Sequence, residues 1–187
     1  AVRDWVLNLN NNLKPMVIPY WVDQTHLNSK YAPKTDISIG FLGRLNKNKG
    51  IEDLLEVFND IQDENINLKI GGHAEESYLQ YLNKISLEEK RKNIHFLGYV
   101  KNRKKFFDSI DIFVFPSFSE GLGLVLLEAM SFSKICLTRD ISPMNEYLTD
   151  ESGYLFINNN QMLNCLEEAI KDFRHDANKI KSKLFNI

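Results

Sequence analysis

The sequence ISIGFLGRLNKNKGIEDLLEVFNDI, residues 37–61, combines a short β-rich run, a loop that contains glycine, and an amphipathic segment. The run at residues 37–42 is a candidate strand, and residues 43–50 form the loop. In the segment that follows, apolar residues recur at helical spacing: Ile51, Leu54, Leu55, Phe58 and Ile61. A strand that leads through a loop into such a helix is one unit of an α/β protein.

The same alternation continues along nearly the whole chain. Six more runs are candidate strands, at residues 16–18, 67–70, 94–97, 112–115, 135–137 and 154–157. Two further sets show helical spacing, namely Leu124, Leu127, Glu128, Met130 and Ser131, and Leu163, Leu166, Ala169, Ile170 and Phe173. The asparagine triplets at residues 10–12 and 158–160 are expected to be polar turns or caps. We therefore predict a Rossmann-like α/β fold, with a parallel sheet and helices on both faces.

The bulk composition is that of one globular domain. The 187 residues suffice for one sizeable core, and 43% hydrophobic with 26% charged residues is an ordinary globular mixture. The formal net charge is -2 and the pI about 6.1. Because binding to nucleic acid depends on neutralising phosphates, we expect no nucleic-acid partner.

The cysteines and the apolar runs bear on the compartment. Cys136 and Cys165 show no paired metal spacing and are expected to be buried free thiols of a reducing compartment. No apolar run is long enough for a membrane span, and residues 1–4 lack a signal-peptide pattern. We expect a cytoplasmic protein. The basic run at residues 101–105 is interpreted as a solvated helix start, with peripheral contact to the inner face of the cell membrane as the alternative.

The loop at residues 43–50 lies where an open α/β sheet binds its ligands, outside the carboxyl end of a strand. Gly43 is expected to permit a sharp turn and Gly50 a close approach to a ligand. Arg44 and Lys49 place two cations beside a helix N-terminus, an arrangement that suits a diphosphate. The alternative is a solvated loop with helix caps, since glycine-rich turns of this kind are common in α/β folds.

A second loop follows the strand expected at residues 112–115. The residues from Gly121 to Gly123 open a helix whose free N–H groups can receive phosphate. Glu120 lies at the rim, while Glu128 lies on an otherwise apolar helix and needs a partner such as a sugar or ribose hydroxyl. The alternatives are a helix-start carboxylate for Glu120 and an internal salt bridge for Glu128.

These segments together resemble the donor-binding domain of the retaining enzymes called glycosyl transferases group 1, which is the C-terminal half of a GT-B fold. The matching positions are Ile18-Pro19-Tyr20-Trp21-Val22-Asp23, Gly43-Arg44-Leu45, Lys49-Gly50, Gly71-Gly72, Phe96-Leu97-Gly98, Pro116-Ser117, Glu120-Gly121-Leu122-Gly123, Glu128-Ala129-Met130, Glu146 and Gly153. The pair of glutamates eight positions apart, flanked by Pro-Ser and Glu-Ala-Met, is the most specific part of the resemblance.

The resemblance implies a role for each matching site residue. Arg44 and Lys49 would hold the donor diphosphate and stabilise it as the leaving group, and Glu120 would contact the transferred sugar. Glu128 would bind the ribose hydroxyls. Main-chain groups would meet the base near Val100 and the phosphates at Gly121, Gly123 and Leu124. The implied reaction is a metal-independent, retaining hexosyl transfer from a nucleotide sugar, with no further cofactor.

The resemblance also divides the chain. Residues 1–23 would be an interdomain connection with the first strand, and residues 24–187 the donor-binding domain. An N-terminal acceptor-binding domain would lie outside this chain as its partner, so this fragment alone is expected to show little or no transfer. The expected setting is the synthesis of cell-surface polysaccharide or glycolipid, with the donor base, the sugar and the acceptor left open.

Some positions depart from the family pattern. Trp21 stands where the family usually has glycine, and residues 131–136 lack its usual glycine and proline. Gly71-Gly72-His73 is a variant of a Gly-x-Gly motif and gives His73 a possible ligand contact. A dinucleotide-dependent oxidoreductase would need Gly-x-Gly-x-x-Gly after its first strand, which is not present. A non-catalytic or degenerate sugar-nucleotide-binding or regulatory domain stays open as the alternative.

Overall fold

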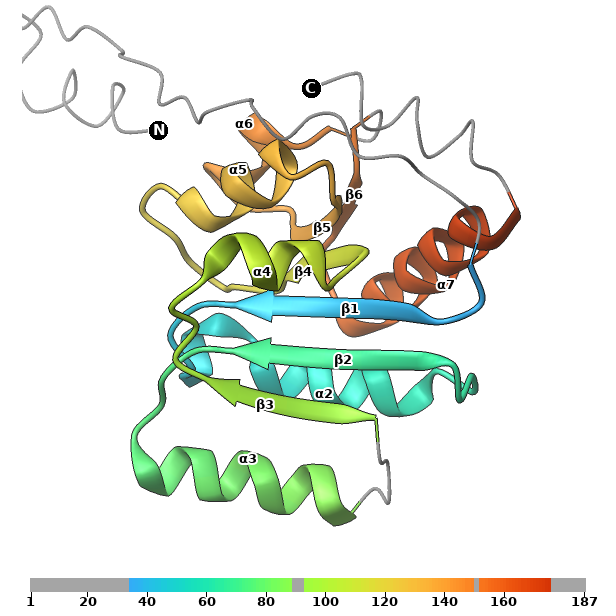
Figure 1. Cartoon of the computed structure of the whole chain (residues 1–187). Coiled ribbons are helices and arrows are strands. Elements are labelled where there is room, and N and C mark those ends of the chain that lie inside the picture. Colours follow the sequence, from blue (N-terminus) through green and yellow to red (C-terminus); the bar gives the residue numbers. More distant parts are fainter. Residues whose placement is uncertain (1–33, 89–92, 150–151, 176–187) are drawn as a thin grey trace, which may run out of the picture.

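The computed structural model describes residues 34–88, 93–149 and 152–175 (Figure 1). Its six described strands form one parallel sheet in the order β3-β2-β1-β4-β5-β6. Their bounds are β1 Ile37–Leu42, β2 Ile66–Gly71, β3 Ile94–Gly98, β4 Ile112–Phe115, β5 Ile135–Arg139 and β6 Tyr154–Phe156. These match the six strands predicted between residues 37 and 157. The strand predicted at residues 16–18, the asparagine turn at residues 10–12 and the connection at residues 1–23 lie outside the described residues.

Helices cover both faces of the sheet, as predicted. Their bounds are η1 Lys47–Lys49, α2 Ile51–Asp60, α3 Glu76–Glu88, α4 Arg103–Asp108, α5 Leu124–Ser131, α6 Met144–Tyr147 and α7 Asn159–His175. Figure 1 shows α4 in front of the sheet and α2 behind it, and α7 packs beside α2. None of the described helices is both long and apolar enough to cross a membrane. The fold is therefore the predicted Rossmann-like α/β arrangement.

The strand sequences are nearly continuous apolar runs because helices cover both faces of the sheet. Every residue of β4 and β5 is buried, whereas β3, at the edge, leaves three of its five residues exposed. Aromatic rings fill the space between β4 and the front helices. Phe107 of α4 stacks on Phe132 with 4.9 Å between ring centroids, and it meets Phe113 of β4 edge-on at 5.9 Å.

The predicted helical stripes are confirmed for α2 and largely for α7, but the stripe on α5 is shifted. Leu126, Ala129 and Met130 face the core, whereas Leu124, predicted to be part of the stripe, is 40% exposed. The reason is local, because Leu124 is the first residue of α5 and lines a surface hollow at the carboxyl edge of the sheet. The basic run at residues 101–105 does form a helix start, in which Asn102 caps α4 by accepting from the N–H of Lys105.

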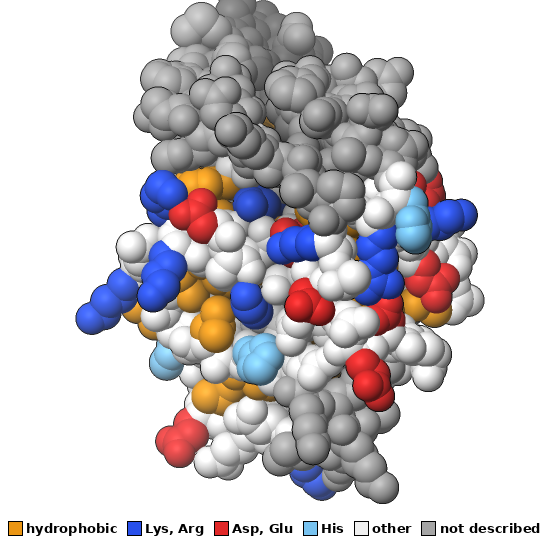
Figure 2. All heavy atoms as spheres, turned by 45° about the vertical axis from the view of Figure 1, so that its right-hand side comes forward, with side chains coloured by type: hydrophobic (Ala, Val, Ile, Leu, Met, Phe, Trp, Pro, Cys, Tyr) orange, Lys and Arg blue, Asp and Glu red, His pale blue; other side chains and the backbone are white. Residues whose placement is uncertain are grey.

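The direction of the chain through the sheet reverses between β1 and β4. From β1 the chain steps outward to β2 and β3, and from β4 it steps the other way to β5 and β6. The loops after β1 and β4 diverge at this switch point, which is where open parallel sheets bind ligands. On the side that bears the amino ends of β1 and β2, acidic and basic side chains are interspersed (Figure 2). The carboxyl ends of the strands lie at the opposite edge of the sheet, and the topology predicts a ligand site there.

Candidate functional site

The loops that follow β1 and β4 are joined directly to each other. Asn48 Nδ2 donates to the carbonyl oxygen of Ser119 at 3.1 Å, and Ser119 Oγ donates to Asn48 Oδ1 at 3.0 Å. The N–H of Phe118 donates to the carbonyl of Asn48 at 2.9 Å. These three hydrogen bonds make one wall from two segments that are 71 residues apart. Nothing in the sequence predicts this contact of Asn48 with Ser119, since isolated polar loop residues carry neither a period nor a motif.

The glycines of the first loop serve the packing of the backbone. Gly50 has φ 65°, and a Cβ atom there would lie 2.3 Å from the carbonyl oxygen of Pro116. The second loop therefore requires glycine at position 50, and the predicted approach of Gly50 to a ligand stays a prediction. The chain does bend at Gly43, but without a positive φ. It is Gly72, with φ 152°, that makes room for the Gly43 carbonyl, to which a Cβ atom would come within 1.8 Å.

Two of the predicted site residues form an ion pair across these loops. Lys49 Nζ lies 2.5 Å from Glu120 Oε1. The two side chains are only 19% and 10% exposed, so water screens the pair little. Lys49 Nζ also lies 5.9 Å from the centroid of the Phe115 ring at the end of β4. The pair places one positive and one negative group at the same point of the carboxyl edge.

A hollow of about 860 Å³ opens beside this pair. Six of the predicted site residues line it, namely Arg44, Lys49, Val100, Glu120, Gly123 and Leu124. Lys101 and Arg103 line it as well, which brings four cations together with Glu120, the single carboxylate among the described residues of the lining. The hollow is therefore electropositive, although the chain as a whole is slightly acidic, and it favours an anionic ligand.

Two predicted residues, Gly121 and Glu128, are not among those that line the hollow. Glu128 is instead held by Arg103, whose Nε lies 2.6 and 2.7 Å from its two carboxylate oxygens, with a further contact from Nη2. This is the internal salt bridge that we gave as the alternative for Glu128. Since Arg103 itself lines the hollow, the carboxylate lies one side chain away from it. The charge run at residues 101–105 gave no sign of this partnership, which joins α4 to α5.

The start of α5 lies in the wall of the hollow. Gly123 precedes the helix with φ 58°, and a Cβ atom there would lie 2.1 Å from Cε of Met144. Leu124 and Val125, the first residues of the helix, both line the hollow. The first N–H groups of an α-helix have no acceptor inside the helix and carry a partial positive charge. An anion in the hollow would therefore meet a helix N-terminus together with the four cations.

The segment that follows β3 forms another part of the wall of the electropositive hollow. Gly98 has φ 64°, and its carbonyl accepts from the N–H of Gly72 at 2.8 Å. Val100 follows and lines the hollow together with Tyr99, which is 76% exposed, so the predicted contact of Val100 with a base is sterically possible. His73 also lines it, so the contact considered for His73 is sterically possible.

Arg139 packs behind the site, and no motif in the sequence predicts this role. This side chain is 9% exposed and pairs with Asp53 of α2 at 2.8 Å. It also donates to the carbonyls of Pro116 at 3.2 Å and Ile157 at 3.0 Å, and it lies 4.2 Å from the centroid of the Phe118 ring. Arg139 thus ties the loop after β4 to α2 and to the end of β6. Its position as the last residue of an apolar strand was the signal that was available.

The chain belongs to the family Glycosyl transferases group 1, whose family model matches residues 23–183. It is thus a glycosyltransferase domain. Among curated proteins, it is 26% identical over 142 residues to the capsular polysaccharide biosynthesis glycosyltransferase CapM of Staphylococcus aureus, an alignment that covers 73% of this chain and 37% of CapM. The chain thus spans little more than a third of that relative.

Solved structures agree on the fold. A mutant of S. aureus TarM, in complex with fondaparinux, alpha-GlcNAc-glycerol and UDP, matches 99% of this chain and 38% of that one, with a TM-score of 0.82 and 22% identity. The C-terminal domain of the group 1 protein LpcC from Francisella tularensis matches 88% of this chain and 93% of that one, with a TM-score of 0.71 and 22% identity. The chain therefore has the fold of the C-terminal half of a GT-B protein.

Proposed function

We propose that this domain binds the nucleotide-sugar donor of a retaining hexosyltransferase. The observation that carries the proposal is the hollow at the switch point, where Arg44, Lys49, Lys101 and Arg103 lie around one lining carboxylate at the start of α5. A diphosphate matches this excess of positive charge and this helix N-terminus. Binding of UDP by the structural relative TarM supports the same class of ligand.

The residues at the hollow suggest how the reaction would be helped. In the proposed transfer, the bond between the anomeric carbon and the diphosphate oxygen breaks, and a bond to the acceptor hydroxyl oxygen forms on the same face of the sugar while the hydroxyl proton passes to the departing diphosphate. Arg44, Lys49 and the N-terminus of α5 would stabilise the charge that develops on the departing diphosphate, which is the work a divalent metal can do elsewhere. We therefore propose a metal-independent reaction. Glu120, held by Lys49, would be the carboxylate that contacts the sugar.

The reacting end of the acceptor would be held by a part of the protein outside this chain. Since the chain spans 37% of CapM, we propose that an N-terminal domain completes the cleft and binds the acceptor. The capsular polysaccharide role of CapM makes cell-surface polysaccharide or glycolipid the proposed pathway class. A cytoplasmic location would fit this role. Contact with the membrane through α4 is the weaker alternative, because Lys104 there is paired with Asp108 and Arg103 with Glu128.

Thermal-shift screening of the chain against UDP, GDP, ADP and their sugars tests the binding step. A ligand that binds only the folded state raises the melting temperature by mass action. We expect one nucleoside diphosphate to raise it in the wild type and to fail with Lys49→Ala. The absence of a shift with all of them would contradict a donor-binding role. Turnover assays separate the catalytic proposal from a purely regulatory one, because only the former predicts transfer once the acceptor-binding domain is joined to this chain.

A further inference from the structure

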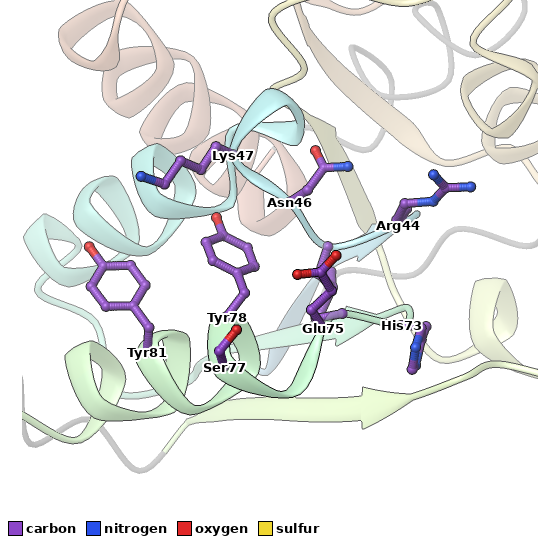
Figure 3. A pocket seen from close by; sticks show the side chains of 10 residues that line it. Arg44, Asn46, Lys47, His73, Glu75, Ser77, Tyr78 and Tyr81 are labelled. Atoms are coloured by element: carbon purple, nitrogen blue, oxygen red, sulfur yellow. The ribbon is translucent and has the colours of Figure 1, made fainter.

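A second hollow, of about 600 Å³, opens on the outer side of the loop after β1 (Figure 3). It lies between this loop and the first turns of α3. Three residues, Arg44, Asn46 and His73, line both this hollow and the electropositive one. A volume of this size is in the usual range for pockets that take small organic ligands. The two hollows thus meet at Arg44, one of the proposed ligands of the donor diphosphate.

A pair of tyrosines forms one wall of the second hollow. The rings of Tyr78 and Tyr81 on α3 are 6.1 Å apart between centroids and inclined by 29°. Figure 3 shows them side by side with their faces turned toward the viewer. Both hydroxyls donate to Glu52 of α2, at 2.9 Å from Tyr78 and 3.1 Å from Tyr81. Because the hydroxyls are engaged, the pair offers a ligand its ring faces.

The tyrosine pair is firmly held. Tyr78 is half-buried, whereas Tyr81 is 44% exposed. Burial, and then the hydrogen bond to Glu52, raise the pKa of Tyr78, so that its hydroxyl stays protonated and keeps donating. Two hydrogen bonds to one carboxylate restrict the rotation of the rings. A ligand that packs on them would not have to order them first.

The rim of the second hollow carries groups of both signs and of both hydrogen-bonding kinds. Arg44 and Lys47 are donors, Glu75 is an acceptor, and Ser77 and Asn46 can be either. When the carboxylate behind each wall is counted, Glu52 here and Glu128 there, two cations face two carboxylates in this hollow, whereas four cations face two carboxylates in the electropositive one. Such a rim does not favour a polyanion. It favours a neutral ligand with many hydroxyl groups, each of which can donate and accept.

We propose that the second hollow is a saccharide-binding subsite that holds sugar residues of the acceptor glycan beside the donor. The C–H face of a sugar ring would pack on Tyr78 and Tyr81, and its hydroxyls would reach the polar rim. A nucleobase could also stack on the rings, but it carries few of the hydroxyl groups that match this rim. The identification of the glycan as acceptor rests on the proposed glycosyltransferase function. The residues that line the subsite belong to this domain, so binding of a glycan can be measured on this chain alone.

Glycan binding by the chain tests this proposal. The wild type is first screened on a printed array of neutral and acidic oligosaccharides, and the strongest neutral binder is then titrated by saturation-transfer difference NMR. We expect Tyr81→Ala to weaken its binding at least about tenfold, whereas Tyr81→Phe, which keeps the ring, stays close to the wild type. Leu97→Ala, at a residue of similar exposure (46%) on the edge strand, is the matched control and should change nothing.

The outcomes separate this proposal from the donor site. Lys49→Ala should weaken binding of UDP or its counterpart by about ten- to hundredfold and leave glycan binding intact, and Tyr81→Ala should weaken glycan binding and leave nucleotide binding intact. Failure of the wild type to bind any neutral glycan, while it still binds a nucleoside diphosphate, would overturn the subsite and spare the donor site. Glycan binding that disappears with Lys49→Ala or survives Tyr81→Ala would also overturn it. A nucleoside that binds through Tyr81 in place of a glycan would do the same.

Discussion

Lys49 Nζ and Glu120 Oε1 lie 2.5 Å apart, although 71 positions separate the two residues in the chain. One follows β1 and the other follows β4, so the pair spans the switch point of the sheet. The ammonium and carboxylate groups neutralise each other at this point. Each of them could also form a hydrogen bond to a bound ligand. A diphosphate would approach Lys49, and the sugar attached to it would approach Glu120. Because Lys49 is paired with Glu120, the further positive charge for a diphosphate would come from Arg44, Lys101 and Arg103, which line the same hollow.

The contact between the two loops should depend on Gly50. In Gly50→Ala, the new Cβ atom would meet the Pro116 carbonyl at 2.3 Å, and the residue would have to keep φ 65°. We expect the free energy of unfolding to fall by at least about 2 kcal/mol, measured by urea denaturation. Gly121→Ala is the matched control, because a Cβ atom there meets nothing within 4 Å. Equal stability of both variants would contradict this account of the loop contact.

Arg139 should be essential for stability. Arg139→Met would leave the carbonyls of Pro116 and Ile157 without this donor and the Asp53 carboxylate without its cation. We expect a loss of about 2–4 kcal/mol in the free energy of unfolding, again from urea denaturation. Asp53→Asn, which keeps an acceptor for Arg139, should cost distinctly less. If the methionine variant is as stable as the wild type, the buried network is not what holds the loop after β4.

Glu128 should act on the nucleoside part of the donor and not on its phosphates. If Glu128 binds the ribose, Glu128→Ala weakens binding of the nucleoside diphosphate but leaves the affinity for inorganic pyrophosphate unchanged or higher, since a negative charge is removed. Isothermal titration with both ligands measures the difference. Arg103→Ala is the companion variant. The Arg103 side chain in the ion pair with Glu128 is 48% exposed. We therefore expect the free energy of unfolding to fall by less than about 1 kcal/mol. An equal loss for both ligands in Glu128→Ala would contradict a ribose role.

The fold could be predicted well from the sequence because apolar runs for strands and helical periodicity for helices both lie within short stretches of the chain. Strands such as β4 and β5 are buried on both faces and read as unbroken apolar runs, and the α2 stripe follows the helical period. The prediction was weaker where a helix serves the site. Leu124 looked like a core residue because of its spacing, yet it begins α5 at the edge of the hollow. α3 was missed, although Tyr78, Leu79, Leu82 and Ile85 recur at helical spacing.

The candidate site was only partly predictable, for a different reason. Arg44, Lys49 and Glu120 follow apolar strands, and the rule that ligands bind beyond the carboxyl ends of strands brings them together. The partnership of Arg103 with Glu128 joins two helices, and the network of Arg139 joins a strand end to α2. Such contacts depend on how elements pack, which no spacing in the sequence encodes. The contact of Gly50 with Pro116 was unpredictable for the same reason, because Pro116 lies in another loop.

The central claim, that the electropositive hollow holds a nucleoside diphosphate through Arg44 and Lys49, is tested most directly by isothermal titration. The nucleoside diphosphate that stabilises the wild type is titrated into Arg44→Ala, Lys49→Ala and the control Lys47→Ala, whose side chain lines only the second hollow of these two. We expect the first two variants to lose about ten- to hundredfold in affinity, the value of one charge-assisted hydrogen bond, and the control to match the wild type. Unchanged affinity in both Arg44→Ala and Lys49→Ala would contradict the claim.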